Sequence, residues 1–124
     1  MKNLLSVTAA IESGTGLMMI IFPSVLSRIL LGSSLEVPVA ITIARIAGVA
    51  IFALGAASWI SRNDVKSRAV RGLVTALMIY NIGTALVLIY TGFSGLSSIS
   101  LLSVVMVHAL MFGWCILELL KKAN

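Results

Sequence analysis

Charged residues are scarce in this chain: they make up 10% of its 124 residues, whereas a soluble domain carries about 25%. Hydrophobic residues make up 60% of the chain. A soluble domain with so few charges would lack an adequate polar surface, so the composition excludes that class. We expect a membrane protein that crosses the bilayer several times and forms a single domain over residues 1–124.

Side chains that bind metals or carry redox chemistry are also nearly absent, since Cys115 is the one cysteine and His108 the one histidine. A lone cysteine cannot form an intrachain disulfide. One histidine with one cysteine cannot supply an ordinary zinc, iron–sulfur or bis-histidine haem site. No glycine-rich phosphate loop or nucleophile elbow is present. We therefore expect no metal site, no cofactor and no catalytic residues.

What the chain does contain is long apolar runs, which predict transmembrane helices over residues 4–22, 37–60, 70–91 and 99–119. At a rise of about 1.5 Å per residue, each is about long enough for a hydrocarbon core of about 30 Å. The first run carries a carboxylate and has no convincing cleavage site before Pro23, so we expect a retained helix rather than a signal peptide. The predicted fold is all-α, a four-transmembrane-helix bundle.

The segment from Pro23 to Glu36 has an amphipathic pattern of its own. Pro23 suits the first turn of a helix, and a Gly-Ser-Ser run starting at Gly32 would end it. Apolar residues fall on one face with Arg28 opposite. This pattern predicts a short helix in the membrane interface between the first two spans, with a plain loop as the alternative.

The second span is rich in small residues. Ala44, Gly48, Gly55 and Ala56 would allow a neighbouring helix to approach closely.

Basic residues are distributed unevenly between the two ends of the predicted bundle. If both termini lie on one side, that side holds seven Lys and Arg residues and the other holds Arg28 alone. The positive-inside rule then places both termini in the cytoplasm. The strongly basic loop also explains the net charge of +5 as a topology signal beside membrane lipid, so we expect no nucleic-acid partner. The residues of that loop are Arg62, Lys66, Arg68 and Arg71.

Each predicted span carries one polar or ionisable side chain well inside it: Glu12, Arg45, Asn81 and His108. Counted from the non-cytoplasmic helix ends, all four lie about 12–15 Å deep. The alternating helix directions would therefore bring them to one level. Tyr80 is adjacent to this layer in sequence.

An isolated charge is costly in hydrocarbon, so the layer needs internal pairing. Glu12 is the one acidic residue at this depth, and we predict an ion pair between Glu12 and Arg45. The guanidinium would keep spare N–H groups for Asn81 or His108, and Thr15 and Thr84 could add hydroxyls. Two interpretations of the layer stay open: a structural lock between helices, or a site that binds or translocates a ligand.

The second span, ARIAGVAIFALGAASW, resembles the DoxX-like small bacterial membrane proteins, through Arg45-x-x-Gly48 followed by Leu54-Gly55. Chain length and helix count agree with that resemblance. It implies a four-helix protein of the bacterial inner membrane, in a group of which some members are associated with quinone-linked sulfur oxidation. The small multidrug transporters are similar in architecture, with a glutamate in the first helix like Glu12.

These observations lead to three functional hypotheses. The first is a non-enzymatic inner-membrane protein whose polar layer binds or transports a small polar or amphipathic ligand, as a homo-oligomer. The second is an accessory subunit that braces a larger membrane complex. The third is a quinone-linked redox subunit, for which the sequence shows no residues that would carry the chemistry.

Overall fold

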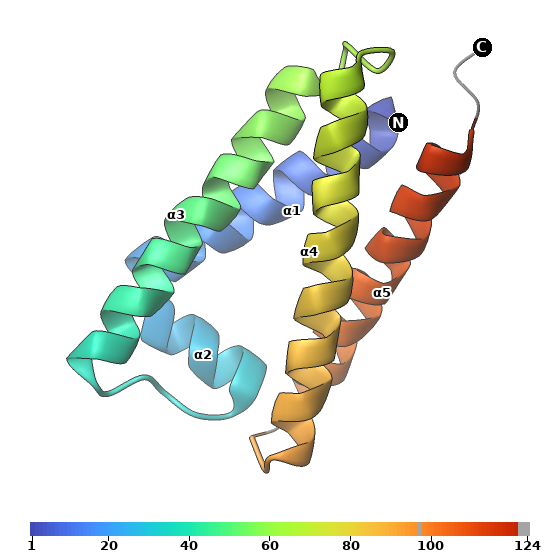
Figure 1. Cartoon of the computed structure of the whole chain (residues 1–124). Helices are drawn as coiled ribbons and strands as arrows, with labels where there is room; N and C mark the ends of the chain where they lie inside the picture. Colours follow the sequence, from blue (N-terminus) through green and yellow to red (C-terminus); the bar gives the residue numbers. More distant parts are fainter. Residues whose placement is uncertain (97, 122–124) are drawn as a thin grey trace.

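The structure is a computed structural model that describes residues 1–96 and 98–121. Over these residues it is helical and contains no strand (Figure 1). The helices are α1 (Lys2–Ile21), α2 (Pro23–Leu31), α3 (Pro38–Ser61), α4 (Arg68–Phe93) and α5 (Ile99–Leu120). Helices α1, α3, α4 and α5 are long and apolar enough to cross a membrane, which confirms that the four predicted segments are helices of that kind. Their bounds agree with the predicted ones to within two residues.

The helix α2 confirms that the Pro23–Glu36 segment begins as a helix rather than a loop. Pro23 stands in its first turn, and Gly32 ends it with a left-handed backbone conformation (φ 73°) that glycine adopts without strain. The Ser98 hydroxyl, just before α5, shares its one hydrogen between the carbonyl oxygens of Ile29 at 2.8 Å and Leu30 at 2.7 Å. These bonds satisfy carbonyls at the end of α2 and hold it against the start of α5.

Helices α1 and α3 pack closely because glycines occupy their crossing. A Cβ atom added to Gly16 would lie 2.7 Å from the carbonyl oxygen of Gly48, and one added to Gly48 would lie 2.9 Å from the carbonyl oxygen of Gly16. Real Cβ atoms do not come so near to backbone. Further along, Gly55 lies against Ser13. The prediction that the small residues of the second span receive a neighbouring helix is therefore confirmed for Gly48 and Gly55.

Helices α4 and α5 form the second closely packed pair (Figure 1). The main apolar core lies between α4, α5 and the start of α1. It therefore occupies the end of the molecule that contains the first turns of α1 and α4 and the last turns of α5. It consists of Leu4, Leu5, Val70, Val74, Leu77, Met111 and Cys115. This core holds the two helix pairs together at one end.

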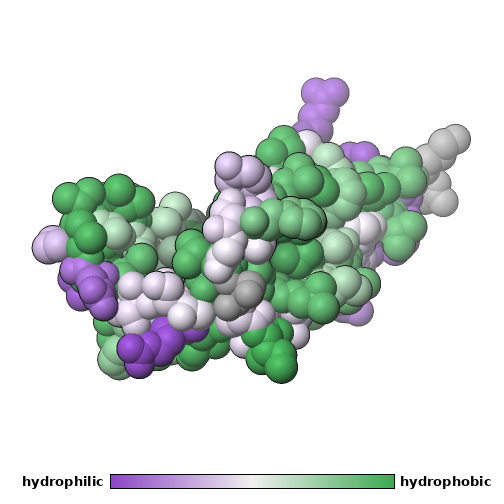
Figure 2. Space-filling view, turned by 90° about the horizontal axis from the view of Figure 1, so that it is seen from below, coloured by the Kyte–Doolittle hydropathy of each residue, from purple (hydrophilic) through white to green (hydrophobic). Residues whose placement is uncertain are grey.

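Towards the opposite end the two pairs diverge, and α2 lies across the space between them (Figure 1). Few contacts link α3 to α4 or α1 to α5. Figure 2, which views the molecule from that end, shows hydrophobic residues over much of the surface and strongly hydrophilic residues in a few places. The start of α1, the end of α5 and the α3–α4 connection lie together at the other end, an arrangement that the predicted topology requires.

Candidate functional site

A cavity of about 760 Å³ lies between the two helix pairs, where they diverge. All five helices line it, and most of the lining side chains are apolar. Of the polar layer predicted from the sequence, Glu12, Tyr80, Asn81 and His108 line this cavity, together with Thr15 and Thr84. These residues come from three of the predicted spans and lie on one cavity, whereas Arg45, from the fourth span, does not line it.

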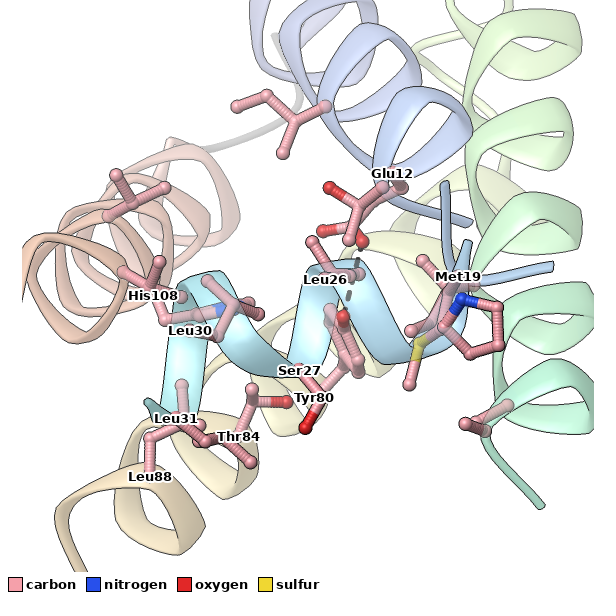
Figure 3. Close-up of a pocket in the computed structure, with 18 of the residues that line it drawn as sticks. Glu12, Met19, Leu26, Ser27, Leu30, Leu31, Tyr80, Thr84, Leu88 and His108 are labelled. Atoms are coloured by element: carbon pink, nitrogen blue, oxygen red, sulfur yellow. Dashed lines mark hydrogen bonds between the residues drawn. The ribbon is translucent and has the colours of Figure 1, made fainter. Parts of the chain in front are cut away.

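Glu12 is the buried carboxylate of the cavity, with 4% of its surface exposed. The Tyr80 hydroxyl donates a hydrogen bond to Glu12 Oε2 at 3.1 Å, which joins α1 to α4 (Figure 3). Glu12 Oε1 makes no hydrogen bond with any residue of the described ranges 1–96 and 98–121. Because Glu12 lines the cavity, its carboxylate keeps acceptor capacity there.

Asn81 and His108 form a second polar pair on the α4–α5 side of the cavity. Asn81 Nδ2 donates to the Leu77 carbonyl at 2.8 Å, and Asn81 Oδ1 lies 2.9 Å from His108 Nδ1. An amide oxygen can only accept, so His108 Nδ1 donates this bond. In a neutral imidazole the other nitrogen, Nε2, is then an acceptor.

The two polar pairs meet through an aromatic contact between α4 and α5. The Tyr80 and His108 rings are arranged edge to face, with their centroids 5.6 Å apart and their planes at 77°. This is a favourable geometry for aromatic rings. The wall formed by Glu12, Tyr80, Asn81 and His108, called here the polar wall, is therefore continuous from α1 to α5.

The predicted ion pair between Glu12 and Arg45 is wrong. Arg45 is exposed on α3, and its Nε donates to the carbonyl of Ile20 at 3.2 Å. Gly16 contacts Gly48, so the antiparallel register places Arg45 beside Ile20, while Glu12 lies about two turns away along the pair. The guanidinium is instead stabilised at the carboxyl end of α1, where the helix has unsatisfied carbonyls and a negative dipole end.

The sequence reasoning missed that α2 forms part of the cavity. Leu26, Ser27, Leu30 and Leu31 of α2 line it, whereas the amphipathic pattern had suggested contact with the membrane interface (Figure 3). The pattern could have supported either interpretation, because an apolar helix face packs equally well on lipid or on protein. No signal in the sequence told which apolar residues of α2 face inward.

The basic loop makes local contacts that hold the ends of the helices. The Arg62 guanidinium lies over the Trp59 ring, 3.3 Å from its centroid. Arg71 donates to the Leu119 carbonyl at 3.0 Å and so joins the start of α4 to the end of α5. Lys66 and Arg68 are exposed. The location of these four residues at one end of the molecule is compatible with their predicted role as topology determinants.

The ion pairs among the described residues lie at the end of α5, away from the cavity. Glu118 pairs with the Met1 ammonium group and, at 2.9 Å, with Lys121, and it also accepts a hydrogen bond from Trp114 at 3.3 Å. Within residues 1–96 and 98–121, no three His, Cys, Asp or Glu side chains lie close enough to hold a metal ion.

Comparisons of the chain with protein-family models, with curated proteins and with solved structures give no match. The resemblance to the DoxX-like proteins therefore stays a prediction.

Proposed function

We propose that this chain is a membrane-embedded binding protein for a small amphipathic molecule and has no catalytic activity of its own. The observation that carries the proposal is the cavity of about 760 Å³, which combines a largely apolar lining with the polar wall. Small-molecule sites have volumes of about 300–1,000 Å³ and this same combination of many apolar and few polar groups. Ionisable residues inside a membrane protein also mark ligand or ion paths more often than not.

Hydrogen bonding favours this proposal over a purely structural lock. A lock of buried polar groups is stable when its members satisfy one another. Here Glu12 accepts one hydrogen bond from a described residue and lines a cavity large enough for a molecule. The spare acceptor capacity is what a ligand would use.

The proposal includes a location and an orientation. The protein lies in the bacterial inner membrane as a homo-oligomer, as the DoxX-like resemblance and the apolar surface suggest. Both termini and the α3–α4 loop face the cytoplasm, and α2 lies near the opposite interface. Under this orientation the cavity opens in the outer half of the bilayer, from where an amphipathic molecule would enter between the helix pairs.

Arg45 favours a second candidate, an accessory subunit of a larger membrane complex. Its side chain is exposed on the outer face of α3, within a predicted span, and one of its N–H groups bonds to Ile20. A guanidinium on that face would be stabilised by a carboxylate of a neighbouring protein. Co-purification of a partner that depends on Arg45, with unchanged ligand binding in Arg45→Met, would favour this role.

Photolabelling in lipid nanodiscs tests the binding proposal. The probe is dodecanol with a photoreactive diazirine in its chain, and labelled peptides are identified by mass spectrometry. We expect labels on the cavity-lining parts of α1, α2 and α4, which excess unlabelled dodecanol removes.

Two matched variants distinguish the cavity from general contact with lipid. Ala47 lines the cavity, so Ala47→Phe should fill part of it and reduce the labelling. Ala53 is exposed elsewhere on the same helix, so Ala53→Phe should leave the labelling unchanged. Labels spread evenly over the outer helix faces in both variants would refute the proposal.

A further inference from the structure

The polar wall offers hydrogen-bond acceptors and has little to donate. Tyr80 uses its hydroxyl hydrogen on Glu12, and Asn81 uses an amide hydrogen on the Leu77 carbonyl. His108 uses its Nδ1 hydrogen on Asn81. The acceptors that stay available include Glu12 Oε1 and, in neutral His108, Nε2, and the spare donor of the wall is the second amide hydrogen of Asn81. A ligand that satisfies this wall must donate hydrogen bonds.

When Glu12 is ionised, the wall also carries one negative charge, and none of the described residues forms an ion pair with it. Among residues 1–96 and 98–121, ion pairs form only at Glu118, and Arg45 bonds to a carbonyl at the end of α1. A carboxylate that is 4% exposed is costly without a positive partner. A cationic group in the cavity would lower that cost.

The rest of the cavity fits an apolar chain. Beyond the polar wall most of the lining side chains are aliphatic, among them Leu26, Leu30 and Leu88, which Figure 3 labels. Ile43 of α3 also lines this part of the cavity. The ligand therefore has a small polar head and an apolar tail.

We propose that the ligand is a protonated primary amine with an apolar tail, and that its ammonium group donates a hydrogen bond to Glu12 Oε1. This inference rests on the proposed binding function and adds the chemistry of the head group. A primary ammonium supplies both the positive charge and N–H donors. An alcohol lacks the charge, a quaternary ammonium lacks the donors, and an anion is repelled by Glu12.

Competition against the photoreactive dodecanol tests the head group in nanodiscs of zwitterionic lipid. The competitors share one tail: dodecylamine, dodecanol, dodecyltrimethylammonium and dodecyl sulfate. A charge-assisted hydrogen bond corresponds to about a tenfold or larger change in affinity. We therefore expect dodecylamine to displace the label at concentrations at least about tenfold lower than any of the other three.

Two glutamate variants assign the effect to the cavity. In Glu12→Gln the preference for dodecylamine should fall to nearly nothing, while the cavity still takes the dodecanol label. Glu36 is exposed in the connection after α2, so Glu36→Gln makes the same charge change outside the cavity and should keep the preference.

The outcomes separate this inference from the binding proposal. If dodecanol labels the cavity but dodecylamine is not preferred, or is preferred equally in Glu12→Gln, the amine inference is wrong and the binding function stands. If no probe labels the cavity, the binding function is wrong, and the inference with it. Should Glu12→Gln not fold, equal competition by dodecylamine and dodecyltrimethylammonium on the unchanged protein would by itself overturn the inference.

Discussion

The Tyr80 hydroxyl donates to Glu12 Oε2 at 3.1 Å and thereby connects the α1–α3 pair to the α4–α5 pair beside the cavity. Few other contacts join the pairs at this level, because they diverge towards the end where α2 lies. The same carboxylate is thus both a structural link and the proposed ligand contact.

Removal of this link should destabilise the protein. We expect Tyr80→Phe to lower the free energy of unfolding by about 1.5–3 kcal/mol, because it deletes a hydrogen bond to a buried carboxylate. Thermal unfolding in detergent measures the change. The control is Tyr90→Phe, since Tyr90 is 74% exposed and no hydrogen bond from its hydroxyl is found among the described residues. Equal melting temperatures for the two variants would show that the link contributes nothing.

The crossing of α1 and α3 should not tolerate a methyl group. Gly48→Ala would place a Cβ 2.9 Å from the Gly16 carbonyl oxygen, so the helices must separate, at a cost of about 1–3 kcal/mol. Gly83→Ala is the matched control, because a Cβ at Gly83 meets nothing within 4 Å. Alanine favours helix over glycine by up to about 1 kcal/mol, so this control should be neutral or stabilising. The melting temperatures of the two variants are compared with that of the unchanged protein. A stabilised Gly48→Ala variant would contradict the close contact between α1 and α3 at Gly48.

Glu12 and Arg45 should behave as independent residues. Because Arg45 bonds to Ile20 and not to Glu12, the effects of Glu12→Gln and Arg45→Met on unfolding should add to within about 0.5 kcal/mol in the double variant. A double-mutant cycle on thermal or chemical unfolding provides the measurement. A substantial coupling energy, with the double variant more stable than Glu12→Gln alone, would restore the ion pair that the sequence suggested.

The proposed orientation can be tested with reporter fusions. An enzyme active only outside the cytoplasm should give no signal when fused to the C-terminus and should give signal when inserted at Ser94, in the α4–α5 connection. The physical reason is the excess of Lys and Arg at the end that carries the basic loop. The reverse pattern would invert the topology and place the cavity in the inner half of the bilayer.

Most of the secondary structure could be predicted from the sequence. A helix is the structure that satisfies its own backbone in lipid, so four apolar runs of sufficient length predict four helices that could span a membrane. The gathering of Glu12, Tyr80, Asn81 and His108 could be predicted too, because polar side chains in such helices turn away from lipid and towards one another.

The partners of these residues were decided only by the tertiary structure. Depths counted from helix ends assumed that the ends lie level, but the contact between Gly16 and Gly48 sets the register of α1 against α3. In that register Arg45 bonds to the Ile20 carbonyl, and Glu12 accepts a hydrogen bond from Tyr80 instead. The cavity likewise depends on how far the helix pairs diverge and on α2 lying between them, which follow from packing between distant segments. Composition and periodicity describe each helix separately, so they determine what a helix must bury but not against which neighbour.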